Sequence, residues 1–260
     1  MKKNWYIIVG LVLIGVAACA EPIRSLVASA QESRTEEGEL ATDAYVQDGL
    51  VAMWDGIVRP GNNLVGGQGD FSLYPSEIGN NSINVLRRIV ATLPYDFCQM
   101  YDIGSIFVTC RLVNRAHASK SVFMFPNPNG TSSSVGVYSW NNSIPIRMFR
   151  GVNWRNTITE SEWPEDDEFT GAFGIVFSTK KGTESPYNVF KAYLDDDLTY
   201  SLTGDNWSFN YDFGGLSNSQ LALGAEGYEL SIYNVRIYNR ELTAEEIAYN
   251  FQIDKERFGL

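Results

Sequence analysis

Short runs of aromatic and β-branched residues, separated by glycine, asparagine, aspartate, serine and proline, follow one another from Tyr45 to the end of the chain. Runs of this kind, with turn residues between them, predict the short strands of a β-sandwich or barrel. The middle of the sequence contains no long stretch with the hydrophobic period of an amphipathic helix. We therefore expect an all-β domain with strands at residues 50–54, 83–90, 105–113, 121–125, 135–140, 144–150, 169–178, 188–194, 198–202, 220–225 and 229–238.

A short helix is expected to follow the last of these strands. Thr243 and Glu246 have the spacing of a capping box, in which both side chains accept hydrogen bonds from exposed backbone N–H groups, so the helix should begin at Ala244. A helix of about two turns is not stable alone in water. Ile247 and Phe251, four residues apart, should therefore pack it onto the sandwich as a lid over one edge or end.

The last strand, residues 229–238, carries apolar side chains on both of its predicted faces. Because successive side chains of a strand point to opposite sides, we expect two sets. One face carries Ser231, Tyr233, Val235 and Ile237, and the other carries Leu230, Ile232, Asn234, Arg236 and Tyr238. This pattern predicts an internal strand that is covered on both sides.

Three stretches resemble a known family. "VRIYNRELTAEEIAYNFQIDKERFG", which begins at Val235, resembles the C-terminal signature of bacterial LamG-like domains of the concanavalin A-like lectin/glucanase superfamily. "DGLVAMWDG" at residues 48–56 resembles the opening strand of that family, and "FKAYLDDDLTY" resembles its central hairpin. The resemblance covers residues 45–260 and implies a two-sheet antiparallel jelly-roll sandwich with a short C-terminal helix. Asp196 stands where the family commonly has glycine, so we expect a hairpin that is one residue longer.

The N-terminus has the features of a secretory signal. A short basic segment and an apolar segment are followed by Val16-Ala17-Ala18-Cys19, which resembles the bacterial lipobox. We therefore predict a lipoprotein signal peptide at residues 1–19, with Cys19 as the lipid-attachment residue; the alternative is an ordinary signal peptide whose cleavage site contains a cysteine. Ala20 follows directly, where inner-membrane lipoproteins usually have aspartate, which favours the outer membrane, at its cell-surface or its periplasmic face.

Residues 20–44 are polar and acidic and contain no aromatic side chain. Such a segment cannot bury enough apolar surface to offset its ordering entropy, so we predict a flexible tether ahead of a LamG-like domain at residues 45–260. The whole chain carries a formal net charge of −11. This charge repels phosphate backbones and anionic lipids, so we expect no nucleic-acid partner and membrane contact only through the lipid anchor.

Catalytic patterns are incomplete in this sequence. Glucanases of the superfamily place two or three carboxylates on alternate residues of one strand. The nearest stretch, "WPEDDEFTG", has Glu165 and Asp167 at this spacing, but Phe169 and Thr170 occupy the place of the acid/base glutamate. The single histidine, His117, lies in a polar run and indicates a surface loop. We predict no catalytic residues and no enzyme activity, with a glycoside hydrolase as the less favoured alternative.

Carbohydrate binding has better candidates. Sugars present apolar C–H faces and hydroxyl rims, so their sites combine an exposed aromatic ring with amide or guanidinium groups. Candidate residues near strand ends are Trp140, Asn141, Asn142, Trp154, Arg155, Trp163, Asn206 and Trp207. For each tryptophan the alternative is a ring that covers the edge of the core, and Trp54, inside the first strand, is expected in the core.

We therefore predict a surface-anchored, non-catalytic, lectin-like protein with a glycan or polysaccharide as its partner. The alternative is a structural, adhesion or protein-interaction module of a surface assembly, with other cell-surface proteins as partners. A contiguous exposed patch of tryptophan and amide groups would favour the first, and a broad apolar patch the second.

Whether the protein binds a cofactor and whether it contains a disulfide stay open at this point. Calcium is the commonest cofactor of the resembled family, but Asp195, Asp196 and Asp197 cannot all point toward one ion, so we assign no metal ligands and expect an acidic turn. Cys98 and Cys110 could close a loop of about 13 residues with a disulfide worth about 3 kcal/mol. Two buried free thiols are the equal alternative.

Overall fold

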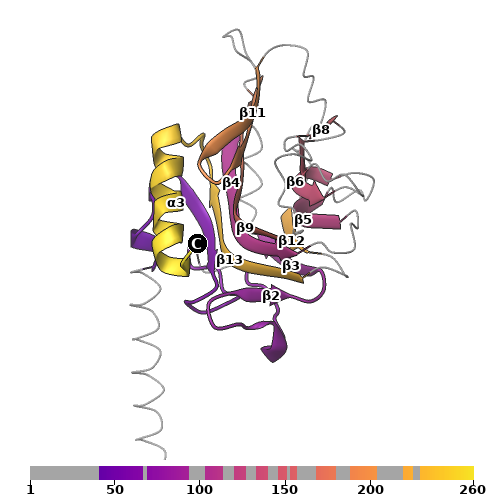
Figure 1. Ribbon diagram of the computed structural model, residues 1–260, viewed down its shortest axis with the longest axis vertical. Helices are drawn as coiled ribbons and strands as arrows, with labels where there is room; N and C mark the ends of the chain where they lie inside the picture. Colours follow the sequence, from indigo (N-terminus) through magenta and orange to yellow (C-terminus); the bar gives the residue numbers. More distant parts are fainter. Residues whose placement is uncertain are drawn as a thin grey trace, which may run out of the picture. The chain divides into compact units, whose positions relative to one another are not determined.

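The computed structural model describes residues 41–66, 69–93, 103–113, 120–126, 133–139, 146–150, 153–156, 168–179, 188–203, 219–224 and 229–260. All of them belong to one compact unit, Ala41–Leu260. This unit is a β-sandwich of two antiparallel sheets with a helix near its C-terminus (Figure 1). The predicted all-β, two-sheet antiparallel sandwich with a C-terminal helix is confirmed.

The described strands form one sheet of seven and one of six. The larger sheet has the order β1 (Leu50–Asp55), β13 (Glu229–Tyr238), β4 (Ile103–Val113), β9 (Glu168–Thr179), β10 (Asn188–Leu194) and β11 (Asp197–Thr203), and β2 (Ile83–Val85) pairs with β13. The smaller sheet has the order β3 (Ile89–Leu93), β12 (Ser219–Leu223), β5 (Lys120–Pro126), β6 (Ser133–Ser139), β7 (Ile146–Arg150) and β8 (Asn153–Asn156). The first described strand therefore lies beside the last one.

Two of the predicted strands, 188–194 and 229–238, have the same bounds in the structure, and eight others overlap an observed strand with small differences at their ends. The strand predicted at residues 83–90 is wrong. It divides at Leu86, Arg87 and Arg88 into β2 of the larger sheet and β3 of the smaller sheet. The short strand β8 was not predicted, because its sequence, NWRN, has no apolar alternation.

The main core lies between the sheets and is built from aliphatic and aromatic side chains. Trp54 is fully buried there, and its indole N–H donates a hydrogen bond to the Gly69 carbonyl at 3.1 Å. Its ring centroid lies 5.2 Å from that of Phe71. The expectation that Trp54 belongs to the core is confirmed, and its polar N–H is satisfied, as burial of indole requires.

A β-bulge in β13 changes which residues share a face. The pairing of β13 with β4 shifts register between Ile232 and Asn234, which leaves Tyr233 as the extra residue. An extra residue reverses the alternation beyond it. Leu230, Ile232, Val235 and Ile237 therefore all join the core between the sheets, while Arg236 and Tyr238 reach groups of α3. The two faces predicted from strict alternation are wrong for this reason.

The helix α3 (Ala244–Phe258) is longer than the expected two turns, at 15 residues. The capping box is confirmed: Thr243 N–H donates to Glu246 Oε2 at 2.9 Å, and Glu246 N–H donates to Thr243 Oγ1 at 3.3 Å. Ile247 and Phe251 are buried, also as predicted.

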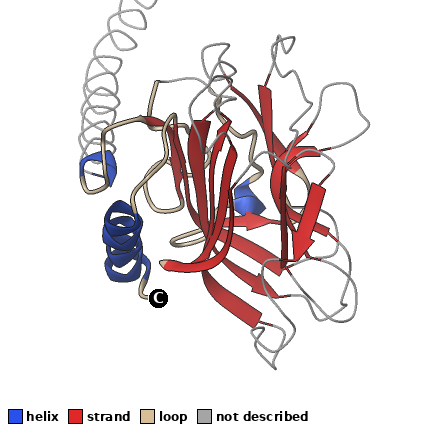
Figure 2. Cartoon of the chain, turned by 90° about the horizontal axis from the view of Figure 1, so that it is seen from above, coloured by secondary structure: helices blue, strands red, loops and turns tan. Residues whose placement is uncertain are grey.

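The predicted position of this helix, over an edge or end of the sandwich, is wrong. Ile247 packs with Phe107, Val176 and Tyr193, which come from the neighbouring strands β4, β9 and β10. The helix therefore covers the outer face of the seven-stranded sheet, and Figure 2 shows it alongside one layer of strands. A face that is covered in this way explains why β13 has apolar groups on both sides.

The β10–β11 hairpin accommodates its extra residue within a strand. Leu194 pairs with Asp197 across a two-residue turn, and Asp195 there has a φ of 59°. The register then shifts so that Thr199 is unpaired, and its hydroxyl donates to the Ala192 carbonyl at 3.1 Å. The additional residue expected at the hairpin tip is thus a bulge in β11.

Candidate functional site

Most residues predicted to bind carbohydrate lie outside the described residues. Trp154 and Arg155 lie on β8, the outermost strand of the described six-stranded sheet, where they pair with Phe149 and Met148 of β7. Outside the described residues are Trp140, Asn141, Asn142, Trp163, Asn206 and Trp207, and also Cys19. The structure thus places one predicted cluster at a sheet edge, and the others stay predictions.

The stretch compared with a carboxylate pair ends in the core. Glu165, Asp167 and His117 lie outside the described residues. Phe169, which stands at the position of the acid/base glutamate, begins the interior part of β9 and stacks on Phe173, with ring centroids 4.4 Å apart. This position therefore has a role in packing between the sheets.

The acidic hairpin holds β10 against β9 through Asp195. Ala172 N–H donates to Asp195 Oδ1 at 2.8 Å, and Asp195 N–H donates to the Ala172 carbonyl at 2.7 Å. Burial raises the pKa of the Asp195 carboxyl, and the hydrogen bond from Ala172 opposes that shift. Among the described residues there is no group of three His, Cys, Asp or Glu side chains that could hold a metal ion. A calcium site stays a prediction.

Cys110 is a free thiol that is fully buried in β4. Burial raises the pKa of this thiol, because a thiolate is poorly solvated in the core. Its proposed partner Cys98 lies outside the described residues. The structure therefore has a free thiol at Cys110, which agrees with one of the two alternatives left open by the sequence.

A buried polar cluster fastens α3 to the seven-stranded sheet. Asp254 of α3 forms an ion pair with Arg236 of β13, and both side chains are almost wholly buried. The hydroxyls of Thr109 and Tyr45 donate to the same carboxylate at 2.6 and 2.8 Å. The Arg236 guanidinium also lies over the Tyr45 ring, 4.4 Å from its centroid. We call these four residues, Tyr45, Thr109, Arg236 and Asp254, the Asp254 cluster; sequence patterns did not reveal it.

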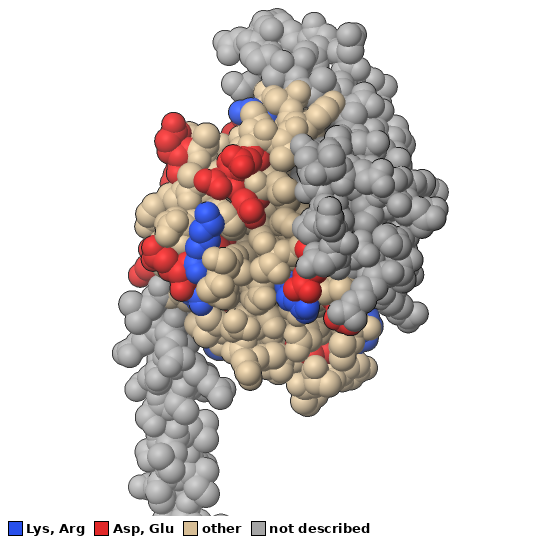
Figure 3. Space-filling model, in the orientation of Figure 1, with Lys and Arg blue, Asp and Glu red and all other residues tan. Residues whose placement is uncertain are grey.

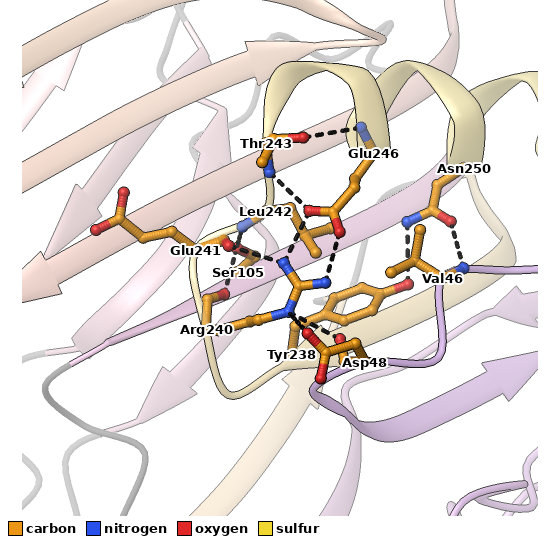
Figure 4. Close-up of polar contacts among 10 residues, drawn as sticks. All are labelled: Val46, Asp48, Ser105, Tyr238, Arg240, Glu241, Leu242, Thr243, Glu246 and Asn250. Atoms are coloured by element: carbon orange, nitrogen blue, oxygen red, sulfur yellow. Dashed lines mark hydrogen bonds and ion pairs between the residues drawn. The ribbon is translucent and has the colours of Figure 1, made fainter.

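A second set of contacts fixes the start of α3 to the segment that precedes β1 (Figure 4). Arg240 forms two hydrogen bonds with the Glu246 carboxylate, at 2.8 and 2.6 Å, and an ion pair with Asp48 at 2.8 Å. The Asn250 side chain accepts from Val46 N–H at 3.0 Å and donates to the Tyr238 hydroxyl at 3.0 Å. These groups are paired with one another, so they join parts of the fold and leave little free to meet a ligand.

The exposed aromatic site with the best-defined geometry lies beside the short 3-10 helix η1 (Pro75–Glu77). Tyr74 is 61% exposed, and the Arg87 guanidinium lies 4.4 Å from its ring centroid. Glu77, only 1% exposed, forms an ion pair with Arg87 at 3.0 Å and accepts the Tyr74 backbone N–H at 2.7 Å. Arg87 Nη2 also donates to the Ser72 carbonyl at 2.9 Å. We call Tyr74, Glu77 and Arg87 the Tyr74 platform.

The predicted sugar sites were tryptophans next to amide or guanidinium groups, so this platform, which is built on a tyrosine, was not among them. The sequence did contain a local signal. Proline directly follows Tyr74, at the first helical position, and a glutamate lies three residues after Tyr74; together they predict a fixed turn. Nothing in the sequence indicated that Arg87, in the turn between β2 and β3, would reach it. Charged side chains of both signs lie near one another on the face drawn in Figure 3, so this face has no field of one sign.

No protein-family model matches the sequence, and no curated protein matches it either. Solved structures do match in fold. A sialidase of Trypanosoma rangeli in complex with 2,3-difluorosialic acid is 14% identical, with a TM-score of 0.56 over 80% of this chain and 33% of the sialidase chain. The receptor-binding domain of a botulinum neurotoxin C/D mosaic serotype is 12% identical, with a TM-score of 0.51 over 80% of this chain and 52% of its own.

A third match, a botulinum neurotoxin type C structure, is 12% identical, with a TM-score of 0.51 over 79% of this chain and 51% of its own. The chain thus spans about a third of the sialidase and half of the toxin domains. At these identities the likeness establishes the fold. The LamG-like resemblance stays a prediction, since the matches are to other sandwich proteins.

The prediction that the chain is not an enzyme is wrong, because the same fold occurs in enzymes. Sialidases are enzymes, and four of the matching chains are Trypanosoma rangeli sialidase. The prediction excluded catalysis because a carboxylate pair was incomplete, whereas glycosidases exist that use a tyrosine nucleophile. A missing carboxylate pair therefore excludes one mechanism and not glycoside chemistry as a whole.

In the part of the chain that the structure describes, no helix is both long enough and apolar enough to cross a membrane.

Proposed function

We propose that this protein is a lipoprotein of the outer membrane whose β-sandwich binds carbohydrate. The observation that carries the proposal is the fold shared with proteins that bind sugars. One is a sialidase bound to a sialic acid derivative, and another is a botulinum neurotoxin whose cell entry depends on two ganglioside molecules. The resemblance of the sequence to LamG-like domains supports the same class of ligand.

The arrangement of aromatic and polar residues supports carbohydrate as the ligand. Trp154 and Arg155 are consecutive residues of β8, the outermost of the described strands of its sheet, and the Arg87 guanidinium, just after β2, lies over the Tyr74 ring. Aromatic faces pack on sugar C–H groups, and guanidinium groups donate to hydroxyls. The net negative charge of the chain does not argue against such a ligand. A neutral glycan is not repelled by it, and an anionic glycan can be bound through direct contact with Lys and Arg side chains.

A glycan array probed with the purified protein tests this function. We expect saturable binding to at least one glycan class, and a parallel array with a calcium chelator asks whether that binding needs calcium. A protein in which Tyr249, an exposed tyrosine of α3, is replaced by alanine serves as a folded control that should bind as the wild type does. Failure to bind any glycan would favour the alternative, a protein-interaction module of a surface assembly.

Anchoring is tested separately from binding. We propose that Cys19 carries the acyl chains and that the predicted tether, up to the start of the compact unit at Ala41, connects this anchor to the domain. Cells grown with a labelled fatty acid should label the wild-type protein, and the Cys19→Ser variant should lose the label and leave the membrane fraction. Equal labelling of both proteins would contradict the anchor and leave the carbohydrate proposal standing.

A further inference from the structure

We infer that the Tyr74 platform is a binding subsite for an uncharged sugar ring; this inference rests on the proposed carbohydrate function and names a site and a ligand class for it. The first support is the open face of the ring. The Arg87 guanidinium covers the Tyr74 ring at 4.4 Å, yet the residue is 61% exposed. The guanidinium lies over one face of the ring, so the exposed part of Tyr74 remains free to contact a ligand.

The second support is rigidity. Glu77 is 1% exposed and contacts both other members of the platform: its carboxylate forms the ion pair with Arg87 and accepts the Tyr74 backbone N–H at 2.7 Å. Pro75 occupies the first position of η1, where its fixed φ suits a helix start. A ring held in place before the ligand arrives loses little conformational freedom on binding, which favours affinity.

The third support concerns charge. The buried Glu77 carboxylate already neutralises Arg87, so the platform presents no unpaired positive charge. Arg87 Nη2 donates to both Glu77 and Ser72, Nε lies 3.0 Å from Glu77 Oε1 in the ion pair without a hydrogen bond, and none of the contacts of the guanidinium with the described residues involves Nη1. Nη1 can therefore donate to a sugar hydroxyl beside the ring, and because the Arg87–Glu77 pair has no net charge it offers a carboxylate-bearing sugar no net attraction.

The two segments that carry the platform also carry exposed apolar side chains, which suit the apolar face of a pyranose. Ile78, 49% exposed, follows η1, and Leu86, 60% exposed, precedes Arg87, so both segments of the platform carry an exposed aliphatic side chain. Ile78 also bridges to Ile83 at the start of β2, which fixes the first segment to the second. Exposed aromatic and aliphatic groups with a few convergent donors are the composition of a sugar site.

The experiment compares the full-length protein with Tyr74→Ala, Tyr74→Phe and Tyr249→Ala variants on uncharged oligosaccharides of glucose, mannose, galactose and N-acetylglucosamine, beside sialylated ones. Tyr74→Ala should weaken binding of the best uncharged probe by about tenfold or more. Tyr74→Phe retains the ring face and should bind as the wild type, as should Tyr249→Ala. Because Tyr74 contacts Glu77 through its backbone N–H, the alanine variant keeps this bond, and an unchanged circular dichroism spectrum confirms its fold.

Four results would overturn the inference. Unchanged binding by Tyr74→Ala would mean that the ring is not used, and an equal loss in Tyr249→Ala would mean that the effect is not local. Binding of sialylated probes alone would leave the carbohydrate function standing and remove this subsite. Binding of no probe by the wild type would remove both.

Discussion

Removal of the Asp254 carboxylate should destabilise the fold strongly. Asp254→Leu leaves the Arg236 guanidinium buried without its ion pair and leaves the hydroxyls of Thr109 and Tyr45 without their acceptor. Breaking a buried ion pair by removing one partner costs about 3–5 kcal/mol. Since folded domains are stable by only about 5–15 kcal/mol, a large share of the total would be lost.

Urea unfolding followed by tryptophan fluorescence measures this effect, because Trp54 is fully buried. With a slope of about 2–3 kcal/mol per molar urea, the midpoint should fall by about 1–2.5 M. Glu256→Gln, an exposed acid on the same helix, is the matched control and should leave the midpoint unchanged within about 0.2 M.

The double variant Asp254→Leu with Arg236→Met separates a buried unpaired charge from simple loss of contacts. Apolar replacement of both partners of a buried pair is often neutral or stabilising, so the double variant should regain most of the lost stability. A loss below about 1 kcal/mol for Asp254→Leu, or a double variant as unstable as the single one, would refute the reasoning.

Three further results are expected. The hydrogen bonds from Arg240 lower the pKa of Glu246, so their contribution is present above the unfolded pKa of about 4.3 and is lost as the pH falls through the folded pKa. Glu246→Gln should therefore cost up to about 1 kcal/mol in urea unfolding at pH 7, and this cost should shrink as the pH falls below the unfolded pKa. Iodoacetamide should label Cys110 only after unfolding, because burial raises the pKa of this thiol, and mass spectrometry of native protein with labelled Cys110 would contradict this. Gly171→Ala should destabilise the fold by about 1–3 kcal/mol in thermal unfolding, because its Cβ would lie 2.2 Å from Asp195 Oδ1, and an unchanged melting temperature would contradict the packing described there.

The sequence was sufficient to predict a fold of two layered sheets, because strands such as 188–194 and 229–238 are bounded by turn residues and carry apolar side chains along their length. It was insufficient where one residue changes the geometry. Tyr233 is an ordinary residue in the sequence, yet as the extra residue of a bulge it reverses the faces of β13. The turn at residues 86–88 likewise has no glycine or proline, so a change of sheet there could not be foreseen.

The candidate sites show a similar division. An exposed aromatic residue could be proposed from local sequence, as Trp154 was, but its partners in space could not. Arg87 reaches Tyr74 only because η1 and the β2–β3 turn are neighbours in the fold, and Asp254 meets Arg236 only because α3 lies on the face of the larger sheet. Helix length was underestimated because propensity alone does not report how much sheet surface a helix can cover.

Titration of the purified protein with the glycan that binds most strongly on the array tests the central claim, carbohydrate binding by the folded sandwich, most directly. The account predicts a saturable calorimetric signal and an increase of the urea midpoint at saturating glycan, because a ligand that binds only the folded state stabilises it. No measurable heat, together with a urea midpoint that does not move at any glycan concentration, would contradict the claim.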